Sequence, residues 1–337
     1  MESLSGKKVL VVGGAGFIGS HLVDGLLAVG AKVSVVDDLS LGKLENLPKE
    51  IVAMNSWTRG NFLSDAVPFA KIDACDLMEL SGFIKRISPE IVFNLAVLPL
   101  PQSLTQPRQN IDADVAIVNN LCYILWKGRF QRLIHFSSSE VYGTAQYEPM
   151  CEKHPLEAST PYAASKAAGD LICMSYVRTF GCNISIIRPF NNYGPRQNAG
   201  SYAGIIPLTI NRILDGKAPV IFGDGHQTRD YIYVADTVRA AIMMAEMYPC
   251  KVKGEIINVA SGHDVSILWL VQEIVSLMHG QGYTTKKIQH QASRPGDVMR
   301  HIANILKAKD VLGFEHRIGM KLGLDRTIAW YVSQKGR

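Results

Sequence analysis

The chain has 337 residues, of which 47% are hydrophobic and 19% are charged, and its formal net charge is +5. This length allows one large or two modest domains with a full apolar core. The mild charge, without any basic run, excludes a typical nucleic-acid-binding protein and fits either an anionic substrate or simply a slightly basic surface. No apolar run reaches the roughly 18 residues that a membrane span needs, so we expect no membrane segment.

The six cysteines show neither a CxxC pair nor a metal-ligand spacing with histidine. They stand at positions 75, 122, 151, 173, 182 and 250. We interpret them as reduced thiols, mostly in packed segments, and expect no metal site. A predicted strand begins almost at the N-terminus and leaves no room for a signal peptide. The sequence therefore predicts a soluble, cytoplasmic protein.

The first predicted strand, Lys7–Val12, is an apolar run that leads into a glycine-rich turn. The glycine turn consists of Gly13, Gly14, Ala15, Gly16, Phe17, Ile18 and Gly19. Gly13 would allow a tight bend and Gly16 would let the backbone approach a pyrophosphate. Gly19 would let the following helix, Ser20–Val29, pack close to the strand, and its N-terminus favours negative charge. This strand-turn-helix pattern predicts a dinucleotide-binding site.

The second predicted strand, Val33–Asp37, ends in an acid 24 residues after Gly13. An acid at this place can accept a hydrogen bond from a ribose 2′-hydroxyl and would repel a 2′-phosphate. NAD is therefore the predicted cofactor. Asp38 is the alternative acid for this contact, and a position in a solvated loop is the simpler explanation of each of these two acids. Residues 54–66 form a predicted irregular insertion.

Two later segments extend this pattern. The strand Ile91–Ala96 ends in Leu95 and Ala96, which we expect beside the nicotinamide half of the cofactor. The helix Asp112–Trp126 is apolar around most of its circumference. Such a helix is either deeply buried or half-buried with a partner covering the rest, so a homodimer interface is one of two explanations.

The fifth predicted strand, Leu133–Phe136, delivers the polar stretch 137–140 to the edge where open α/β sheets bind ligands. The next predicted helix, Tyr162–Gly181, carries Tyr162 and Lys166 four residues apart on one face. A nearby cation and a bound oxidised nicotinamide both favour the phenolate form of tyrosine. Tyr162 is therefore predicted as the base that takes a proton from a substrate hydroxyl.

The alternation of strand and helix predicts an α/β fold with a parallel, doubly wound Rossmann sheet, to which Ile184–Arg188 adds a sixth strand. We expect residues 1–190 to form the NAD-binding domain, with the catalytic residues at its sheet edge. Residues 191–337 are expected to form a smaller, discontinuous substrate-binding part, with some segments returning to the first domain. Further predicted helices lie near residues 206–214, 235–247, 267–279 and 320–330.

Several segments carry a resemblance to a known family. They are GGAGFIGS, Asp37, SSSEVYG, PYAASK, RPFNNYGPRQ, GDGHQTRDYIYV and RPGD. In this order and spacing, from about residue 7 to 335, they resemble the extended short-chain dehydrogenase/reductases that act on nucleotide sugars. The sugar-nucleotide 4,6-dehydratases and the tunicamycin-type UDP-GlcNAc 5,6-dehydratase are the most similar groups, and UDP-glucuronate decarboxylases and UDP-glucose 4-epimerases share the scaffold. The resemblance implies an NAD-dependent enzyme that acts on a UDP-sugar and forms a homodimer.

The resemblance also implies roles for single residues. Tyr162 would be the base for the sugar 4-hydroxyl, Lys166 would lower its pKa and hold the nicotinamide ribose, and Ser138 would hydrogen-bond the same oxygen. Asp76 and Leu77 would meet the adenine. The implied substrate-binding residues are Asn191, Leu208, Val220, Phe222, Arg229 and Arg294. The two arginines would hold the diphosphate, which guanidinium groups bind in a bidentate manner, although surface ion pairs are the simpler explanation.

Glu140 separates the candidate reactions. All begin with hydride leaving sugar C4 for NAD, which gives a 4-ketosugar. The family's dehydratases carry an Asp-Glu pair where this chain has Ser139 and Glu140, so the C5 base is present without the Asp acid. We rank a dehydratase first, a 4-epimerase second and a decarboxylase third, with Arg196 or Arg300 as its cation. A structural carboxylate bound to backbone N–H groups is the simpler explanation of Glu140.

Two further points follow from the resemblance. The presence of Tyr162, Lys166 and Ser138 disfavours a non-catalytic NAD-binding scaffold, since such proteins typically lose one of them. Asp114 stands where the family usually has Asn in the helix behind the cofactor, and an added acid there would alter local hydrogen bonding.

Overall fold

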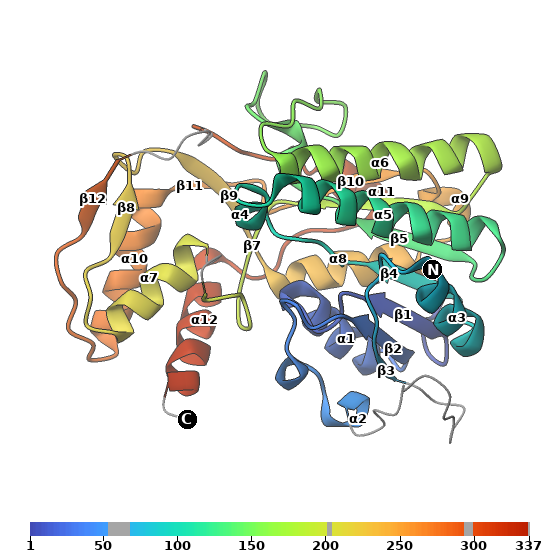
Figure 1. Cartoon of the computed structure of the whole chain (residues 1–337). Coiled ribbons are helices and arrows are strands. Elements are labelled where there is room, and N and C mark those ends of the chain that lie inside the picture. The colour runs from blue at the N-terminus through green and yellow to red at the C-terminus, as the bar shows by residue number, and fades with distance from the viewer. Residues whose placement is uncertain (53–67, 201–203, 293–298, 336–337) are drawn as a thin grey trace.

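The computed structural model describes residues 1–52, 68–200, 204–292 and 299–335. A seven-stranded parallel sheet of order β10-β6-β5-β4-β1-β2-β3 lies beside a smaller part (Figure 1). Its strands are β1 Lys8–Val12, β2 Lys32–Asp37, β3 Phe69–Lys71, β4 Ile91–Asn94, β5 Arg132–Phe136, β6 Ile184–Pro189 and β10 Ile256–Val259. The predicted doubly wound α/β fold is confirmed. The order reverses between β1 and β4, where such sheets bind ligands.

Helices cover both faces of the large sheet (Figure 1). One face carries α1 Phe17–Ala28, α8 Val234–Glu246 and α11 Leu306–Leu312, and the other carries α3 Leu77–Ile87, α5 Pro107–Trp126 and α6 Pro161–Phe180. Strand side chains alternate, so Val9 and Val11 join one apolar core while Leu10 and Val12 join the other. Full burial of each such side chain contributes roughly 1.5–3 kcal/mol, which explains the unbroken apolar runs in the sequence.

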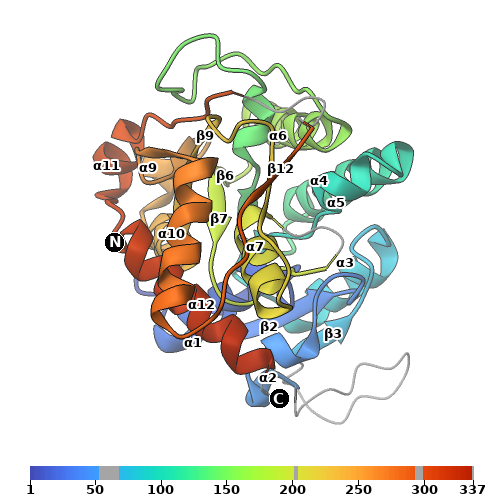
Figure 2. The ribbon, with the colours of Figure 1, turned by 90° about the vertical axis from the view of Figure 1, so that its left-hand side faces the viewer.

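The smaller part has its own apolar core between two small sheets and three helices (Figure 2). The sheets are β11-β9-β7 and β12-β8. These elements are β7 Asn191–Tyr193, β8 Val220–Phe222, β9 Thr228–Tyr233, β11 Asp264–Ser266, β12 Gln289–Gln291, α7 Ile205–Leu214, α10 Ile267–Gly280 and α12 Met320–Lys335. The remaining short helices are η1 Leu44–Asn46, α2 Lys49–Val52, α4 Leu100–Ser103, η2 Ser139–Tyr142 and α9 Pro249–Val252.

Segments from after residue 190 cross back to the large sheet. β10 is its edge strand, and α8 and α11 pack on one face. The buried carboxylate of Asp230 joins the two parts, because it accepts hydrogen bonds from the main-chain N–H groups of Ser261, Gly262 and Ala303. Burial raises the pKa of Asp230 to about 6, although these hydrogen bonds act to lower it.

Local sequence signals explain how the helix that carries the predicted base begins and ends. Helix α6 begins at Pro161 after the cap Thr160, whose Oγ1 accepts from Ala163 N at 3.1 Å, and it ends at Gly181 with a φ of +68°. The described residues contain no helix long and apolar enough to cross a membrane. The predicted insertion at 54–66 and the predicted phosphate contact Arg294 lie outside the described residues.

Candidate active site

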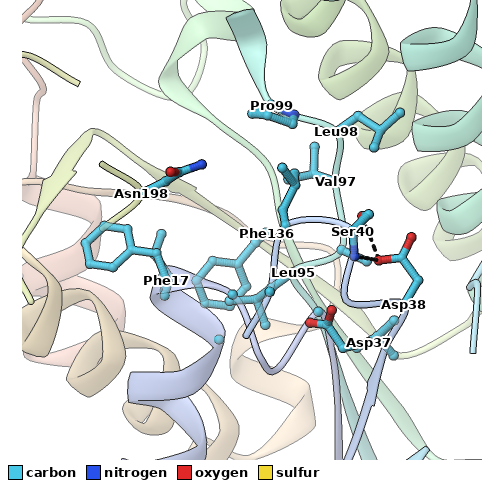
Figure 3. Close-up of a pocket in the computed structure, with 18 of the residues that line it drawn as sticks. Phe17, Asp37, Asp38, Ser40, Leu95, Val97, Leu98, Pro99, Phe136 and Asn198 are labelled. Carbon is cyan, nitrogen blue, oxygen red and sulfur yellow. Dashed lines mark hydrogen bonds between the residues drawn. The ribbon is translucent and has the colours of Figure 1, made fainter. Parts of the chain in front are cut away.

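A cleft of about 960 Å³ runs along the edge where the strands of the large sheet end (Figure 3). The predicted residues that line it are Gly13, Gly16, Phe17, Ile18, Gly19, Asp37, Asp38, Leu95, Ala96, Ser138, Tyr162 and Lys166. The structure therefore brings together the glycine turn, the ends of β2, β4 and β5, and the start of α6.

The glycine turn depends on the absence of side chains. Gly13 has a φ of +80°, and a Cβ on it would lie 2.6 Å from Ala96 N on the turn after β4. A Cβ on Gly19 would overlap the carbonyl oxygen of Gly13. Gly16 caps α1 without a side-chain hydrogen bond, so the first amides of this helix stay available to an anion. This arrangement suits a pyrophosphate at the helix N-terminus.

Asp37 holds the neighbouring wall together. Its Oδ2 accepts from Ala15 N at 2.9 Å and its Oδ1 accepts from Leu39 N at 2.9 Å. Burial raises the pKa of Asp37, and the two backbone hydrogen bonds partly offset this effect. Asp38 is exposed instead and accepts hydrogen bonds from Ser40 in its own turn (Figure 3). Asp37 is therefore the better placed of the two predicted acids to face a buried ribose.

Asp76 and Leu77 are not among the described residues that line the cleft. Asp76 is the N-cap of α3 and accepts hydrogen bonds from Met78 N and Glu79 N at 2.9 and 3.0 Å. Helix capping accounts for this carboxylate. The preceding residue Cys75 lines the cleft in its place.

Tyr162 and Lys166 face the end of β5 from the first turns of α6. The Ser138 side chain hydrogen-bonds the Tyr162 phenol, and Lys166 Nζ donates to a main-chain carbonyl at the end of β5 at 2.9 Å. Burial raises the pKa of Tyr162, and the hydrogen bond from Ser138 lowers it. The charges of Asp114 and Glu140 raise it further. Burial and these two carboxylates therefore oppose ionisation of the Tyr162 phenol.

A buried polar network supports the stretch that contains Ser138. Arg188 on β6 pairs with Asp170 on α6 at 2.9 Å, and both side chains are 2% exposed. Asp170 also accepts from Ser137 Oγ at 2.9 Å, and Arg188 donates to the Tyr142 hydroxyl at 3.0 Å. The sequence analysis missed this pair. The available signals were an arginine inside a buried strand and an acid four residues after Lys166.

Ser139 and Glu140 open the short helix η2. Ser138 Oγ accepts from Glu140 N at 3.2 Å, and the Glu140 charge acts on the Tyr162 phenol. Ser139 is buried, and its backbone is hydrogen-bonded to His301. The charge of Glu140 therefore acts on Tyr162, although Ser139 and Glu140 are not among the described residues that line the cleft.

The predicted substrate residues belong to the smaller part, and none of the described ones lines the cleft. They are Asn191 on β7, Leu208 on α7, Val220 and Phe222 on β8, and Arg229 on β9. Asn191 Nδ2 donates to the carbonyl of Asp230 at 3.1 Å, and Arg229 Nη1 donates to the carbonyl of Thr228 at 2.9 Å. These residues lie on several elements of the smaller part, of which β7 reaches the cleft wall through the neighbouring Asn192.

The smaller part nevertheless contributes a wall that the sequence analysis missed. Asn198 and Phe17 both line the cleft (Figure 3), and Trp330 and Tyr331 of α12 line it as well. The Tyr331 hydroxyl donates to the carbonyl of Gln197 and so ties α12 to this loop. No local pattern in the sequence indicates this contact.

The two arginines considered for a decarboxylase both have carboxylate partners. Arg196 lines the cleft and pairs with Asp24 of α1 at 2.7 Å. Arg300 pairs with Glu148 at 2.6 Å and with Asp264 at 2.9 Å, away from the cleft walls. Only Arg196 of these two is therefore placed at the cleft.

The sequence profile of the NAD dependent epimerase/dehydratase family matches residues 9–260. The chain belongs to this family. It is 32% identical to the UDP-glucose 4-epimerase of Mycolicibacterium smegmatis, over 96% of this chain and 98% of that protein. It is 31% identical to a UDP-N-acetyl-alpha-D-glucosaminuronate decarboxylase of Bacillus cytotoxicus, over 96% and 98% of the two chains. A structure of the dTDP-glucose 4,6-dehydratase of Streptomyces venezuelae, a double mutant with NAD bound, is 28% identical, with a TM-score of 0.86 over 98% of both chains.

The protein is thus an NAD-dependent enzyme of the epimerase/dehydratase family, as its motifs predicted. The cleft fits NAD, because the glycine turn leaves space for a pyrophosphate and Asp37 stands at the end of β2, where a 2′-phosphate would be repelled. The named relatives carry three different activities, so similarity assigns the family and the cofactor and leaves the reaction to the site itself.

Proposed function

We propose that the enzyme is a dehydratase of a UDP-hexose or UDP-N-acetylhexosamine. The observation that supports this reaction is that the charge of Glu140, whose main-chain N–H donates to Ser138 Oγ, acts on the Tyr162 phenol. A dehydratase needs a base for the C5 proton, whereas a 4-epimerase does not. We assign residues 1–190 mainly to NAD and residues 191–337 mainly to the nucleotide sugar.

Each proposed catalytic residue has one step. Tyr162 accepts the proton of the sugar 4-hydroxyl while Ser138 hydrogen-bonds the same oxygen, and Lys166 holds the nicotinamide ribose. NAD supplies the hydride acceptor for C4. The resulting ketone makes the C5 proton acidic, and Glu140 removes it. The C5–H and C6–O bonds break, a C5–C6 double bond forms, and the departing hydroxyl takes a proton from Glu140 and leaves as water. The hydride would then return to the sugar, either at C6, with a solvent-derived proton added at C5, or at C4, with the proton of Tyr162 returned to the 4-oxygen.

The nucleotide end of the substrate is assigned to the smaller part. Arg229 and Arg294 would hold the diphosphate, and Asn191 would contact the sugar. Leu208, Val220 and Phe222 would contact the nucleobase side. Guanidinium groups match phosphate oxygens in a bidentate geometry.

A 4-epimerase is the second candidate. It is favoured by the 32% identity to the Mycolicibacterium smegmatis UDP-glucose 4-epimerase. This reaction uses the same Tyr162 step, and the ketosugar then turns over so that hydride returns to the other face. Glu140 would have no proton to remove.

Proton NMR in deuterated water separates these reactions. We would incubate the enzyme with UDP-GlcNAc, UDP-glucose and UDP-glucuronate. A 4,6-dehydratase yields a 4-keto-6-deoxy product that carries deuterium at C5, and a 5,6-dehydratase yields an exocyclic alkene that has lost its C5 proton. Changed H4 couplings with C5 still protonated would establish the epimerase and reject our proposal, and a pentose from the glucuronate alone would establish a decarboxylase.

A variant pair tests Glu140 directly. Glu140→Gln should lower the rate of deuterium uptake at C5 by about 100-fold or more, while hydride transfer to NAD persists. Glu157→Gln removes an exposed acid of the following loop and should leave both steps unchanged. Equal C5 exchange in the two variants would exclude Glu140 as the base.

We also propose that a second copy of the chain covers α5 and α6. Apolar side chains on these two adjacent helices are exposed, among them Tyr123, Trp126, Leu171 and Phe180. Light scattering should give the mass of two chains, and Leu171→Asp should reduce it to one. A monomer in the unaltered protein would reject the interface.

A further inference from the structure

Asp114 lies on α5, buried behind the helix that carries Tyr162 and Lys166. Its Oδ1 accepts from Leu98 N at 2.9 Å, and its Oδ2 lies 2.6 Å from Ser165 Oγ. Leu98 is part of the cleft wall after β4 (Figure 3). Ser165 stands on α6 between the two proposed catalytic residues. One carboxylate thus joins the cleft wall to the catalytic helix.

The buried charges around Lys166 balance only if Asp114 is counted. Arg188 and Asp170 neutralise each other in a direct ion pair. The acids that act on Lys166 are Asp114 and Asp170, and Asp170 is already paired. The cation that acts on Asp114 is Lys166. A buried charge without a counter-charge is costly, so Asp114 and Lys166 stabilise each other.

We propose that Asp114 is a positioning residue that fixes Leu98 to the catalytic helix. Its negative charge balances the positive charge of Lys166 and opposes ionisation of Tyr162. This inference rests on the proposed role of Tyr162 as the base. An Asn at this position could keep the hydrogen bonds but would carry no charge. The enzyme would therefore ionise Tyr162 only when the positive charge of the oxidised nicotinamide is in place.

The other titratable groups around this site come from several elements. Glu140 on η2 acts on Tyr162, and Asp170 on α6 acts on Lys166. Burial and Lys166 lower the pKa of His135 on β5, so this ring is neutral. Burial raises the pKa of the Cys75 thiol to about 12, with a smaller effect of Asp114. These groups stay in place when only residue 114 is changed.

Asp114→Asn isolates the charge from the hydrogen bonds. The single proton of the Ser165 hydroxyl can serve either Asp114 Oδ2 or the Tyr162 carbonyl, which lies 2.8 Å away. In the variant, the amide oxygen can accept from Leu98 N and the amide NH₂ can donate to Ser165 Oγ. Ser165 then donates to the Tyr162 carbonyl, so both links persist.

The test is a titration of Tyr162 in the NAD-loaded protein. Ultraviolet phenolate absorbance is followed against pH, and subtraction of the matching Tyr162→Phe protein isolates this phenol. Asp114→Asn should move its titration to lower pH by about one unit, as loss of a nearby buried charge predicts. Asp112→Asn removes a charge from the same helix, at a side chain that is 69% exposed, and should not move it.

An unchanged or upward-shifted titration in Asp114→Asn would overturn the inference. If that variant does not fold, Asp114→Ser removes the same charge and is judged by the same outcomes. If Tyr162→Phe removes no titrating phenol, the role of Tyr162 fails together with the inference. A clear titration of Tyr162 that is the same in wild type and Asp114→Asn would overturn only the role of Asp114.

Discussion

The cofactor side and the proposed substrate side of this enzyme are built in different ways. The cofactor cleft is formed by backbone turns and buried side chains at the ends of adjacent parallel strands. On the substrate side, Asn191 and Arg229 contact carbonyl groups of their own part of the chain. One side depends on close backbone approach, and the other on side chains held by hydrogen bonds.

This difference indicates where each side tolerates change. The glycine turn of the cofactor cleft has no side chain to lose, so it is disrupted by added atoms. A substrate site made of side chains can change its specificity by substitution while the sheet beneath it stays intact. This agrees with relatives that share the family and carry different activities.

The largest expected effect is a loss of stability on substitution of Asp170, in the buried network. Asp170→Asn leaves the Arg188 guanidinium buried without its counter-charge, and we expect unfolding free energy to fall by about 4 kcal/mol. Urea unfolding measures it. Asp215→Asn breaks an exposed ion pair with Lys335 and should change the unfolding free energy far less, because solvent screens surface ion pairs. Similar losses in the two variants would show that the buried network does not support the site.

On the cofactor side, Gly19→Ala should weaken NAD binding by about 100-fold, or about 3 kcal/mol, because its Cβ overlaps the carbonyl oxygen of Gly13. Calorimetric titration with NAD measures it. Gly82→Ala on α3 is the matched control, since its Cβ would meet no atom within 4 Å. Wild-type affinity in Gly19→Ala would contradict the backbone account of this cleft.

At the junction with the substrate side, burial lowers the pKa of His301 from its ordinary value of 6.5 to about 4. Because the unfolded chain then binds more protons between these values, acidification through this range favours unfolding. Acidification from pH 7 to pH 5 should lower the free energy of unfolding by about 2 kcal/mol through this group. Comparing the unfolding free energies of His301→Gln and wild type at both pH values isolates the contribution of His301.

His279→Gln, at an exposed position on α10, is the control for the histidine titration. The pH dependence of His301→Gln should be flatter than that of both wild type and this control. Identical slopes in all three proteins would show that His301 is not held neutral beside Ser139.

Local patterns predicted much of the fold and the cofactor cleft. The glycine turn, the strand-end acid Asp37, and the helix that starts at Pro161 depend on residues within a few positions of each other. Such features are decided by backbone conformation, apolar periodicity and capping, which a sequence displays directly. Asp76 shows the limit of this reasoning, because the same acid can cap a helix.

What the sequence by itself determined is therefore the parallel sheet, the dinucleotide turn and the Tyr162–Lys166 spacing. The tertiary structure alone decided which distant groups meet them: Asp114 with Leu98 and Ser165, Arg188 with Asp170, and α12 at the cleft wall. These contacts depend on how helices pack across the sheet edge. Burial then makes each pair energetically strong, and burial is a property of the folded chain rather than of any local pattern.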